Sequence, residues 1–305
     1  MGIAVVFPGQ GSQAPGMGVP WQDTASWSLV GPASDATGIA LADLLIDAPA
    51  EALAATREAQ LSVLTASLLA WQAFDATLDR SELVAMAGHS LGQITALIAS
   101  ETVTLADGFR LATARADASA LAQASTGGAL LALLGADEDT AHQACEAAPG
   151  AAWVANINGA GQVVVGGRPE VLDAVAERAT ELGVRRVRKL AVDGAFHTPL
   201  MTLAAETLAP VLETIDFHSP VVPVVTNHDA QAVTSADGWP ERLTTHLVQP
   251  VRWAEVVEEL VALGADTIVE VGPGKTLTGL IKRIAPDIEV RNVSTPADLL
   301  SEVSR

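Results

Sequence analysis

The chain has 305 residues, of which 49% are hydrophobic and 17% are charged, and its formal charge at pH 7 is −19. This composition supports a large packed core and excludes a disordered chain, while the acidic balance argues against a nucleic-acid partner. A single cysteine (Cys145), no signal-peptide pattern and no apolar run of the roughly 18 residues that a membrane helix needs lead us to expect a cytoplasmic protein without a membrane segment.

The first predicted element is a buried strand over residues 3–7, which ends in the loop Pro8-Gly9-Gln10-Gly11-Ser12-Gln13. The glycines on either side of Gln10 let the backbone turn sharply and approach a ligand. Strand ends are also where α/β sheets usually bind their ligands. Gln10 is therefore either a polar turn residue or a group whose amide holds a neighbouring turn or donates to an oxyanion.

Helices dominate the segment that follows. Residues 14–60 are predicted as loop and short helices, with Trp21 and Trp27 as packing anchors. Over residues 60–78, apolar side chains recur at helical spacing. We expect a buried helix there that packs against the next strand.

Residues 83–100 have the pattern of a buried strand, a tight turn and a helix. The turn, Gly88-His89-Ser90-Leu91-Gly92, matches the nucleophile elbow G-x-S-x-G. Its two glycines allow strand and helix to approach closely, and Ser90 lies at a helix N-terminus that favours negative charge. Ser90 is thus a candidate nucleophile, and the alternative is a glycine-rich turn without catalytic function.

A helix predicted over residues 105–124 carries Arg110 and Arg115. Because they are five residues apart, the two side chains point in different directions, and one can face the core while the other faces solvent. A buried arginine needs an anion, either an acidic side chain or a ligand carboxylate. The residues alone leave both possibilities open.

A small subdomain is predicted over residues 126–192. Its elements follow the order strand, helix, strand, strand, helix, strand, which is the ferredoxin-like pattern. An early proline starts the second helix and Gly183 ends it. The predicted elements cover residues 130–134, 137–148, 153–158, 162–165, 169–182 and 184–192.

His197 is the candidate base for a catalytic serine. It follows the small subdomain in the loop Asp193-Gly194-Ala195-Phe196-His197-Thr198-Pro199, which can reach the end of the main sheet. His89 adjoins Ser90, and neighbours in an extended strand point to opposite faces. No histidine or cysteine pair has the spacing of metal ligands, so metal chemistry has no support.

The last third of the chain returns to alternating strands and helices. Pro250 biases Gln249 away from the helical conformation. Strands are predicted over 221–226, over 267–271 and near Val290, and helices over 241–247, 254–263 and 276–284. The fold class is therefore α/β: an α/β-hydrolase-like catalytic subdomain (1–125 and 193–305) with a parallel sheet and a nucleophile elbow, and an inserted ferredoxin-like subdomain (126–192).

Five motifs occur in order along nearly the whole chain: Phe7–Gln13, Gly88–Gly92, Gly194–His197, Gln249–Trp253 and Glu270–Gly274. Together they resemble the malonyl-CoA:acyl carrier protein transacylases of bacterial fatty acid synthesis. They are also similar to the acyltransferase domains of polyketide synthases. The resemblance implies that a malonyl group passes from malonyl-CoA to the pantetheine thiol of holo-acyl carrier protein.

The resemblance implies a ping-pong mechanism. Ser90 would attack the thioester with His197 as base, and the carrier thiol would then take the malonyl group from Ser90. No cofactor is implied beyond CoA as part of the substrate. A backbone carbonyl near the Gln249-Pro250 step would orient His197, in preference to the nearby Asp193.

The same resemblance also implies which groups bind the negative charges of the substrate. The N–H groups of Gln10 and Leu91 would bind the oxyanion. Arg115 would hold the malonyl carboxylate with its two-pronged guanidinium, which leaves Arg110 a structural role.

Three further residues complete the predicted substrate-binding set. Phe196 would crowd the malonyl α-carbon and disfavour methylmalonyl groups, while Asn158 and Gln249 would lie at the cleft. The chain departs from the family at Gln93, where glutamate is usual. Glutamine forfeits at most about 1 kcal/mol of helix-dipole stabilisation, so we expect activity to survive.

Acyl carrier proteins are acidic, so an acidic enzyme needs a local positive patch to bind one. The candidates are exposed strand and helix residues near the cleft, and an ordinary solvated surface is the alternative. They are Arg185, Arg186, Arg188, Lys189, Lys275, Lys282 and Arg283. We expect the enzyme to be a monomer.

Other functions remain possible on the same scaffold. A polyketide-pathway acyltransferase would use the same residues with a different carrier. An acyl-thioester hydrolase would use water as acceptor, and a non-catalytic module would retain only a relic elbow. Arg115 and the complete set of motifs argue against the last two.

Overall fold

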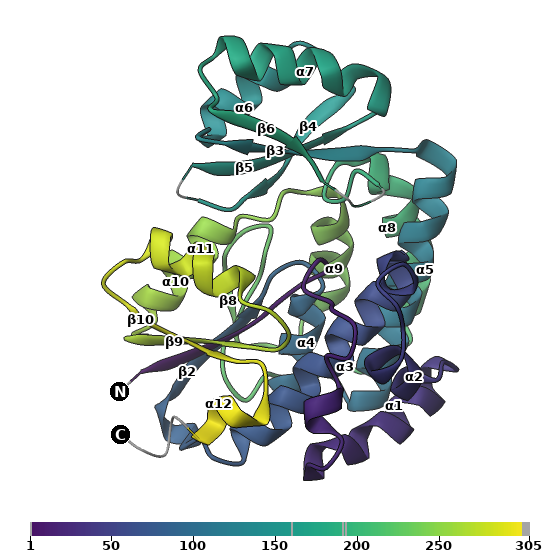
Figure 1. Ribbon diagram of the computed structural model, residues 1–305, viewed down its shortest axis with the longest axis vertical. Helices are drawn as coiled ribbons and strands as arrows, with labels where there is room; N and C mark the ends of the chain where they lie inside the picture. Colours follow the sequence, from purple (N-terminus) through teal and green to yellow (C-terminus); the bar gives the residue numbers. More distant parts are fainter. Residues whose placement is uncertain (1, 160, 191, 193, 301–305) are drawn as a thin grey trace.

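The computed structural model describes residues 2–159, 161–190, 192 and 194–300. Within them lie a six-stranded sheet, in the order β10-β9-β1-β2-β7-β8, and a four-stranded sheet, in the order β4-β5-β3-β6. Figure 1 shows the smaller sheet with α6 and α7 as a separate layer above the larger sheet. The larger sheet consists of β1 (Ile3–Phe7), β2 (Leu83–Gly88), β7 (Val224–Val225), β8 (Ala232–Val233), β9 (Thr267–Val271) and β10 (Glu289–Val293).

Parallel pairing in the larger sheet places two of the predicted motifs side by side. Strands β10, β9, β1, β2 and β7 are parallel, and only β8 runs antiparallel to its neighbour. Phe7, the last residue of β1, pairs with Gly88, the last residue of β2. The loop that contains Gln10 and the turn that contains Ser90 therefore leave the sheet at the same edge, where α/β sheets bind ligands.

Both faces of the larger sheet are covered by helices, which explains why β1 is apolar throughout. Ile3, Val5 and Phe7 point to one face and pack with α3, α4 and α5. Ala4 and Val6 point to the other face and pack with α10 and α11. These helices are α3 (Thr56–Asp75), α4 (Gly92–Ala99), α5 (Leu105–Thr126), α10 (Trp253–Ala262) and α11 (Thr276–Ile284).

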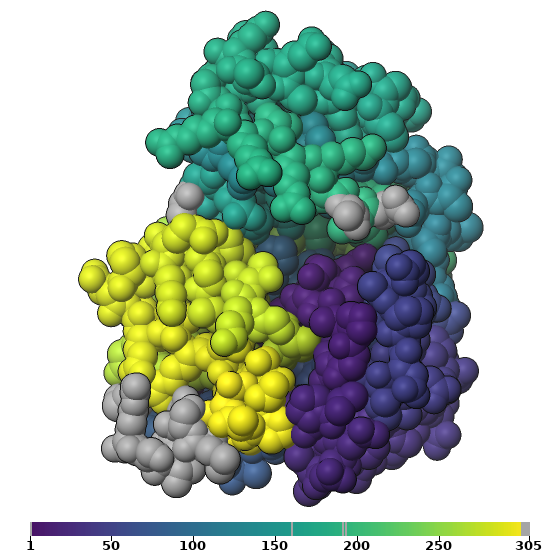
Figure 2. Space-filling model, viewed as in Figure 1, coloured from purple at the N-terminus to yellow at the C-terminus, as the bar shows by residue number. Residues whose placement is uncertain are grey.

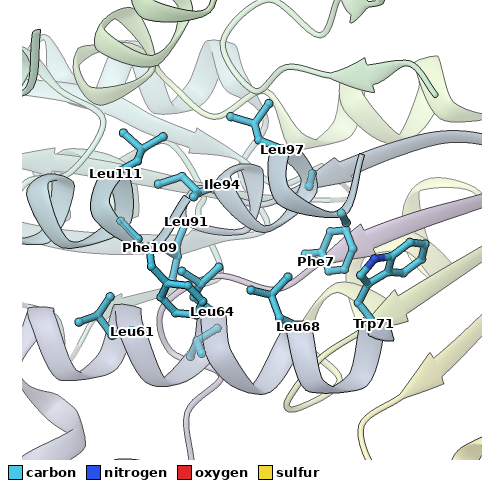
Figure 3. Close-up of a cluster of buried hydrophobic side chains, with 14 of the residues drawn as sticks. Phe7, Leu61, Leu64, Leu68, Trp71, Leu91, Ile94, Leu97, Phe109 and Leu111 are labelled. Atoms are coloured by element: carbon cyan, nitrogen blue, oxygen red, sulfur yellow. The ribbon is translucent and has the colours of Figure 1, made fainter. Parts of the chain in front are cut away.

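Helix α3 confirms the buried helix predicted for residues 60–78, although its neighbours differ from the expectation. It packs most extensively against α5, and then against α4 and α2 (Leu41–Ile46), rather than against the elbow strand β2. Figure 3 shows Leu61 and Leu64 of this helix facing Leu91 and Phe109, and Trp71 meets Phe7 edge to face at 6.0 Å. The helix that carries the elbow thus lies between α3 and the sheet.

The remaining helices cover the ends of the larger sheet and the start of the chain. Trp21 is buried, as predicted for a packing anchor, whereas Trp27 is only partly buried. Short 3-10 helices at Val19–Trp21, Ala25–Leu29, Ala52–Ala54, Arg80–Glu82 and Pro199–Met201 were not predicted individually. The other α-helices are α1 (Val30–Thr37), α2 (Leu41–Ile46), α8 (Thr202–Leu212), α9 (Trp239–Val248) and α12 (Pro296–Leu300).

The smaller lobe has the predicted strand–helix–strand–strand–helix–strand order and a hydrophobic cluster of its own. It is tied to the larger lobe, because the Ile157 N–H donates to the Val251 carbonyl at 2.8 Å and the Val251 N–H donates to the Ala155 carbonyl at 3.0 Å. Its last strand is shorter than predicted. The elements are β3 (Ala129–Leu134), α6 (Glu138–Cys145), β4 (Ala152–Ile157), β5 (Gln162–Gly167), α7 (Pro169–Glu181) and β6 (Arg186–Lys189).

The strand predicted over residues 221–226 is reduced to Val224–Val225. Prolines at 220 and 223 cannot donate to a ladder, which limits the pairing to a short piece. The described part of the chain contains no helix long and apolar enough to cross a membrane.

Glycine at the elbow is required by close backbone contact. A Cβ added at Gly92 would lie 2.1 Å from the Phe7 carbonyl oxygen, and one added at Gly88 would lie 2.0 Å from the Gly92 carbonyl. The predicted close approach of strand and helix is therefore confirmed, and neither contact leaves room for a methyl group.

We expect Gly92→Ala to lower the free energy of unfolding by at least about 2 kcal/mol, because the added methyl must push backbone atoms apart. Gly31 in α1 is the matched control, since a Cβ there meets no atom within 4 Å. Gly31→Ala should change stability by less than about 1 kcal/mol, in the stabilising direction. Urea denaturation of both variants checks this, and equal effects would contradict the contact analysis.

Candidate active site

Ser90 occupies a constrained turn between β2 and α4. Its φ is +53°, a left-handed conformation that four non-glycine residues adopt in the described part of the chain, His197 among them. Its Oγ lies 2.7 Å from Nε2 of His197. Non-glycine residues in this region are strained and persist only where surrounding contacts hold them, which points to a functional turn.

His197 is oriented by a backbone carbonyl, as expected for the family, but the carbonyl belongs to His246. The His197 Nδ1–H donates to this oxygen at 2.8 Å. A carbonyl can only accept, so Nδ1 carries the proton and Nε2 presents its lone pair to the Ser90 hydroxyl. The ring is therefore in the tautomer that a general base requires.

The orienting carbonyl lies near the predicted Gln249-Pro250 step, four residues before the proline. In α9 the carbonyl of His246 would normally accept from the N–H of residue 250, which is proline and has none. This frees the His246 oxygen for His197. Gln249 itself is exposed and lines a separate cavity of about 280 Å³ behind His197.

Asp193, the alternative orienting group, lies outside the described residues. Cys145 lines the cavity behind His197, and burial raises the pKa of its thiol to about 12. A thiol with that pKa stays protonated at neutral pH and is a poor nucleophile.

Arg115 is the buried cation of the site. Its Nη2 donates to Ser90 Oγ at 3.0 Å and its Nη1 to Oε1 of Gln60 at 2.7 Å. Within the described residues no acidic side chain pairs with it, although it is only 4% exposed. Arg110 instead binds Asp107 at the surface, at 2.6 Å. The two arginines therefore divide as predicted, one outward and one inward.

Burial and this charge determine the protonation of the site. Burial first, and then the positive charge of Arg115, lower the pKa of His197 to about 3. Burial lowers the pKa of Arg115 to about 10, which leaves the guanidinium protonated at neutral pH. The resting site therefore combines a neutral imidazole with a cation that has no acidic partner among the described residues.

The elbow leaves one backbone donor available for an oxyanion. The N–H groups of His89, Gly92, Gln93 and Ile94 donate to backbone carbonyls, and that of Ser90 donates to Asn227 Oδ1. No acceptor is recorded for the Leu91 N–H or for the Gln10 N–H within the described chain.

The loop that carries Gln10 lies against the same turn. A Cβ added at Gly9 would lie 2.5 Å from the His89 carbonyl oxygen and 3.7 Å from the Leu91 nitrogen. The Gln10 side chain accepts from Nε2 of Gln60 at 3.3 Å. Both predicted oxyanion donors thus come from chain segments that touch each other next to Ser90.

A cavity of about 220 Å³ opens at Ser90, under the hollow that Figure 2 shows between the two lobes. The predicted residues that line it are Gln10, Ser90, Arg115, Asn158, Phe196 and His197. The small lobe contributes an apolar wall of Leu130, Ala132 and Val164. Polar and apolar groups thus converge on Ser90 from both lobes.

His89 also lines this cavity, which corrects its predicted orientation. Its Nε2 lies 2.9 Å from Oδ1 of Asn158, and its ring meets Trp253. The alternation of an extended strand does not apply, because the chain is already turning at Ser90. His89 thereby links the elbow to Asn158, the residue that follows β4 of the small lobe.

Sequence reasoning missed Gln60, His246 and Asn227. They contact the site from 55, 49 and 137 residues away in sequence. The His246 ring also stacks on His197, with centroids 4.8 Å apart. No local pattern signals such partners; the only hint is the position of His246 four residues before Pro250. The described residues contain no cluster of acidic, histidine and cysteine side chains able to hold a metal ion.

Comparison with known proteins gives consistent results. The family model for the acyl transferase domain matches residues 4–295. The malonyl CoA-acyl carrier protein transacylase of Escherichia coli (strain K12) is 36% identical over 301 residues, which cover 97% of this chain and 96% of that protein. The structure of an acyl-carrier-protein S-malonyltransferase from Burkholderia pseudomallei 1710b is similar over 100% of both chains, with a TM-score of 0.95 and 34% identity. A malonyl-transacylase in complex with a type II PKS acyl-carrier protein has a TM-score of 0.94 and 34% identity, over 100% of this chain and 99% of that one.

The pKa of His197 predicts an unusual pH dependence. A base with a pKa of about 3 stays unprotonated above that pH, so the rate of Ser90 acylation by a serine-directed reagent should vary less than about twofold between pH 5 and 8. Arg115→Gln removes the neighbouring positive charge, which raises the pKa of His197 and moves the acid limb upward. An inflection near pH 6.5 in the unmodified enzyme would contradict this.

Proposed function

The chain belongs to the acyl transferase domain family, and on that premise we propose that it transfers a malonyl group from malonyl-CoA to the pantetheine thiol of acyl carrier protein. The names of its relatives support this reaction. The observation that carries it for this chain is the buried Arg115, 3.0 Å from Ser90 Oγ and without an acidic partner in the described residues. A cation held there matches an acyl group that carries its own carboxylate.

In the first half-reaction the Ser90 oxygen attacks the thioester carbon of malonyl-CoA while its proton passes to Nε2 of His197. The N–H groups of Leu91 and Gln10 bind the resulting oxyanion, a donor pair of which each member typically supplies about 3 kcal/mol. The carbon–sulfur bond then breaks, and the CoA sulfur takes the proton from His197. The product is a malonyl ester of Ser90.

The second half-reaction reverses these steps with a different thiol. The carrier's pantetheine thiol gives its proton to His197, and its sulfur attacks the ester carbon. The carbon–oxygen bond breaks, and the Ser90 oxygen recovers its proton from His197. The neutral tautomer fixed by the His246 carbonyl supports both directions of proton transfer.

Arg115 affects both the choice of acyl group and the pKa of His197. Its charge contributes to the low pKa of His197 in the resting enzyme. A malonyl carboxylate bound to the guanidinium neutralises this charge, so the substrate itself makes His197 more basic. An acetyl group cannot do so. Phe196 lines the cavity next to His197 and disfavours a methyl branch by roughly 1–3 kcal/mol.

We also propose the subdomain division derived from the sequence: an α/β-hydrolase-like unit over 1–125 and 193–305 and a ferredoxin-like unit over 126–192. The two sheets, the strand order and the separate hydrophobic clusters support it. Asn158, at the border of the two units, contacts His89 and lines the cavity, which supports its assignment to substrate binding. Gln249 lines the separate cavity behind His197 and not this one, so its position does not support a role in substrate binding.

For the carrier protein we propose a docking surface made of the basic residues near the cleft mouth. All of them are exposed, and within the described residues no ion pair to an acidic group is recorded for any of them. They make up seven of the 17 Lys and Arg residues in a chain of charge −19. The seven are Arg185, Arg186, Arg188, Lys189, Lys275, Lys282 and Arg283. Neither a cofactor nor a second subunit is needed for this chemistry.

A polyketide pathway is the second candidate destination for the malonyl group. The observation behind it is the similarity to a malonyl-transacylase in complex with a type II PKS acyl-carrier protein, which is no greater than the similarity to other transacylase structures. The chemistry at Ser90 is the same in both pathways, so kinetic comparison of carriers from the two pathways separates them.

Intact-protein mass spectrometry after mixing with malonyl-CoA tests the proposed reaction. We expect a malonyl adduct that is absent in Ser90→Ala and that disappears when holo-acyl carrier protein is added. Arg115→Ala should lose the adduct with malonyl-CoA while acetyl-CoA still acylates Ser90. An adduct that disappears equally fast without carrier would instead indicate a thioester hydrolase.

Charge reversal tests the docking surface. Arg186→Glu combined with Lys282→Glu should raise KM for the carrier by at least about fivefold at low ionic strength, because exposed charges steer an acidic partner. The rate of Ser90 acylation by malonyl-CoA should change by a smaller factor than KM for the carrier does. Arg178→Glu, at a cation that already pairs with Glu181, is the control. An unchanged KM for the carrier would contradict the proposed docking surface.

A further inference from the structure

Asn227 makes the most complete set of contacts with the Ser90 turn, and the chemistry above does not use it. It follows β7 and is fully buried. Its Oδ1 accepts from the Ser90 N–H at 2.7 Å, and its Nδ2 donates to the Gly88 carbonyl at 2.8 Å. Both atoms of one amide therefore bind the two residues that flank His89.

The backbone of Asn227 is fixed as well. Its N–H donates to Oε1 of Gln93 at 3.0 Å, and its carbonyl accepts from the Arg252 N–H at 2.8 Å. With side chain and backbone both engaged, the amide cannot rotate without breaking several buried hydrogen bonds. Such loss is strongly unfavourable, because the groups left behind have no water to bind.

This arrangement matches what the strained serine needs. Ser90 has a φ of +53°, which the chain would relax if the turn were free. Holding the Ser90 N–H on one side and the Gly88 carbonyl on the other prevents that relaxation. It also occupies the Ser90 N–H, so that the neighbouring Leu91 N–H is the donor of the turn left without a recorded acceptor in the described chain.

We propose that Asn227 is a positioning residue that holds Ser90 in its reactive conformation, and that Gln93 fixes Asn227 in turn. The inference rests on the proposed nucleophilic role of Ser90. Asn227 acts through the backbone of the turn and does not touch the reacting atoms.

The same contacts explain why glutamine can occupy position 93, where the transacylase family usually has glutamate. Gln93 is fully buried, its Oε1 accepts from Asn227, and its Nε2 has no partner. Only the acceptor is used, and a glutamate would supply the same acceptor. The substitution relative to the family therefore preserves the contact that matters here.

The test measures Ser90 reactivity apart from malonyl transfer. A small alkyl fluorophosphonate forms a bond from Ser90 Oγ to phosphorus, expels fluoride and leaves the serine proton with His197. For Asn227→Ala we expect the labelling rate and kcat to fall together by at least about 30-fold, because a small misplacement of the nucleophile has large effects. KM for malonyl-CoA should stay within about twofold, since ground-state binding is untouched.

Two further comparisons separate positioning from stability. Asn292→Ala is the matched control. Asn292 lies on the edge strand β10, and its side-chain amide also donates to two backbone carbonyls, those of Glu270 and Gly274. The Asn292→Ala variant should have a lower melting temperature, but its Ser90 should react with the fluorophosphonate at the rate of the unmodified enzyme. Should Asn227→Ala fail to fold, Gln93→Leu is expected to slow labelling by about fivefold, while Gln93→Glu stays within about twofold.

Normal labelling by folded Asn227→Ala, or equal losses in Gln93→Leu and Gln93→Glu, would overturn the inference. The two proposals fail in different ways. An enzyme that labels at Ser90 but transfers no malonyl group would overturn the proposed function and leave this inference standing. An unmodified enzyme that does not label at Ser90 would overturn both.

Discussion

The electrostatics of the site depend on one buried arginine that has no acidic partner among the described residues. Arg115 contacts the nucleophile directly and lowers the basicity of His197. Burying a cation without an anion lowers the stability of the fold, so we infer that the charge of Arg115 has a function. Under the proposed function, the carboxylate of the acyl group is the anion that Arg115 lacks, and its binding would make His197 more basic by neutralising one of the causes of its low pKa.

The backbone around this charge is arranged before any substrate arrives. Parallel pairing of β1 and β2 brings the Gln10 loop and the Ser90 turn to one sheet edge. Glycines at 88 and 92 permit backbone contacts that no side chain could fit. Pro250 leaves the His246 carbonyl without an intrahelical donor, and this carbonyl fixes the tautomer of His197. Polar groups held in place by the fold need no reorganisation during the reaction.

Local patterns predicted most of the fold and the reacting groups. The alternation of strands and helices, the small lobe and the elbow each depend on residues close in sequence, and Ser90, His197 and Gln10 lie in recognisable motifs. Arg115 lies outside the motifs, and only the resemblance assigned it to the substrate carboxylate. The partners that hold these groups did not follow from the sequence. Asn227 reaches Ser90 across 137 residues, and Gln60 reaches Arg115 across 55. The resemblance placed the orienting carbonyl only near the Gln249-Pro250 step, and the structure identifies it as the carbonyl of His246, four residues before the proline. His89 was misplaced because the rule of alternation ends where the chain turns.

The measurement that tests this account most directly is ¹⁵N NMR of the histidine side chains in the resting enzyme. The account predicts that His197 is the neutral tautomer protonated at Nδ1, and that it remains so from pH 8 down to pH 5. Arg115→Gln should let the ring protonate at a higher pH than in the unmodified enzyme. A His197 ring that is doubly protonated at pH 6 would contradict the lowering of its pKa by burial and the Arg115 charge, and a neutral ring protonated at Nε2 would contradict the role of the His246 carbonyl.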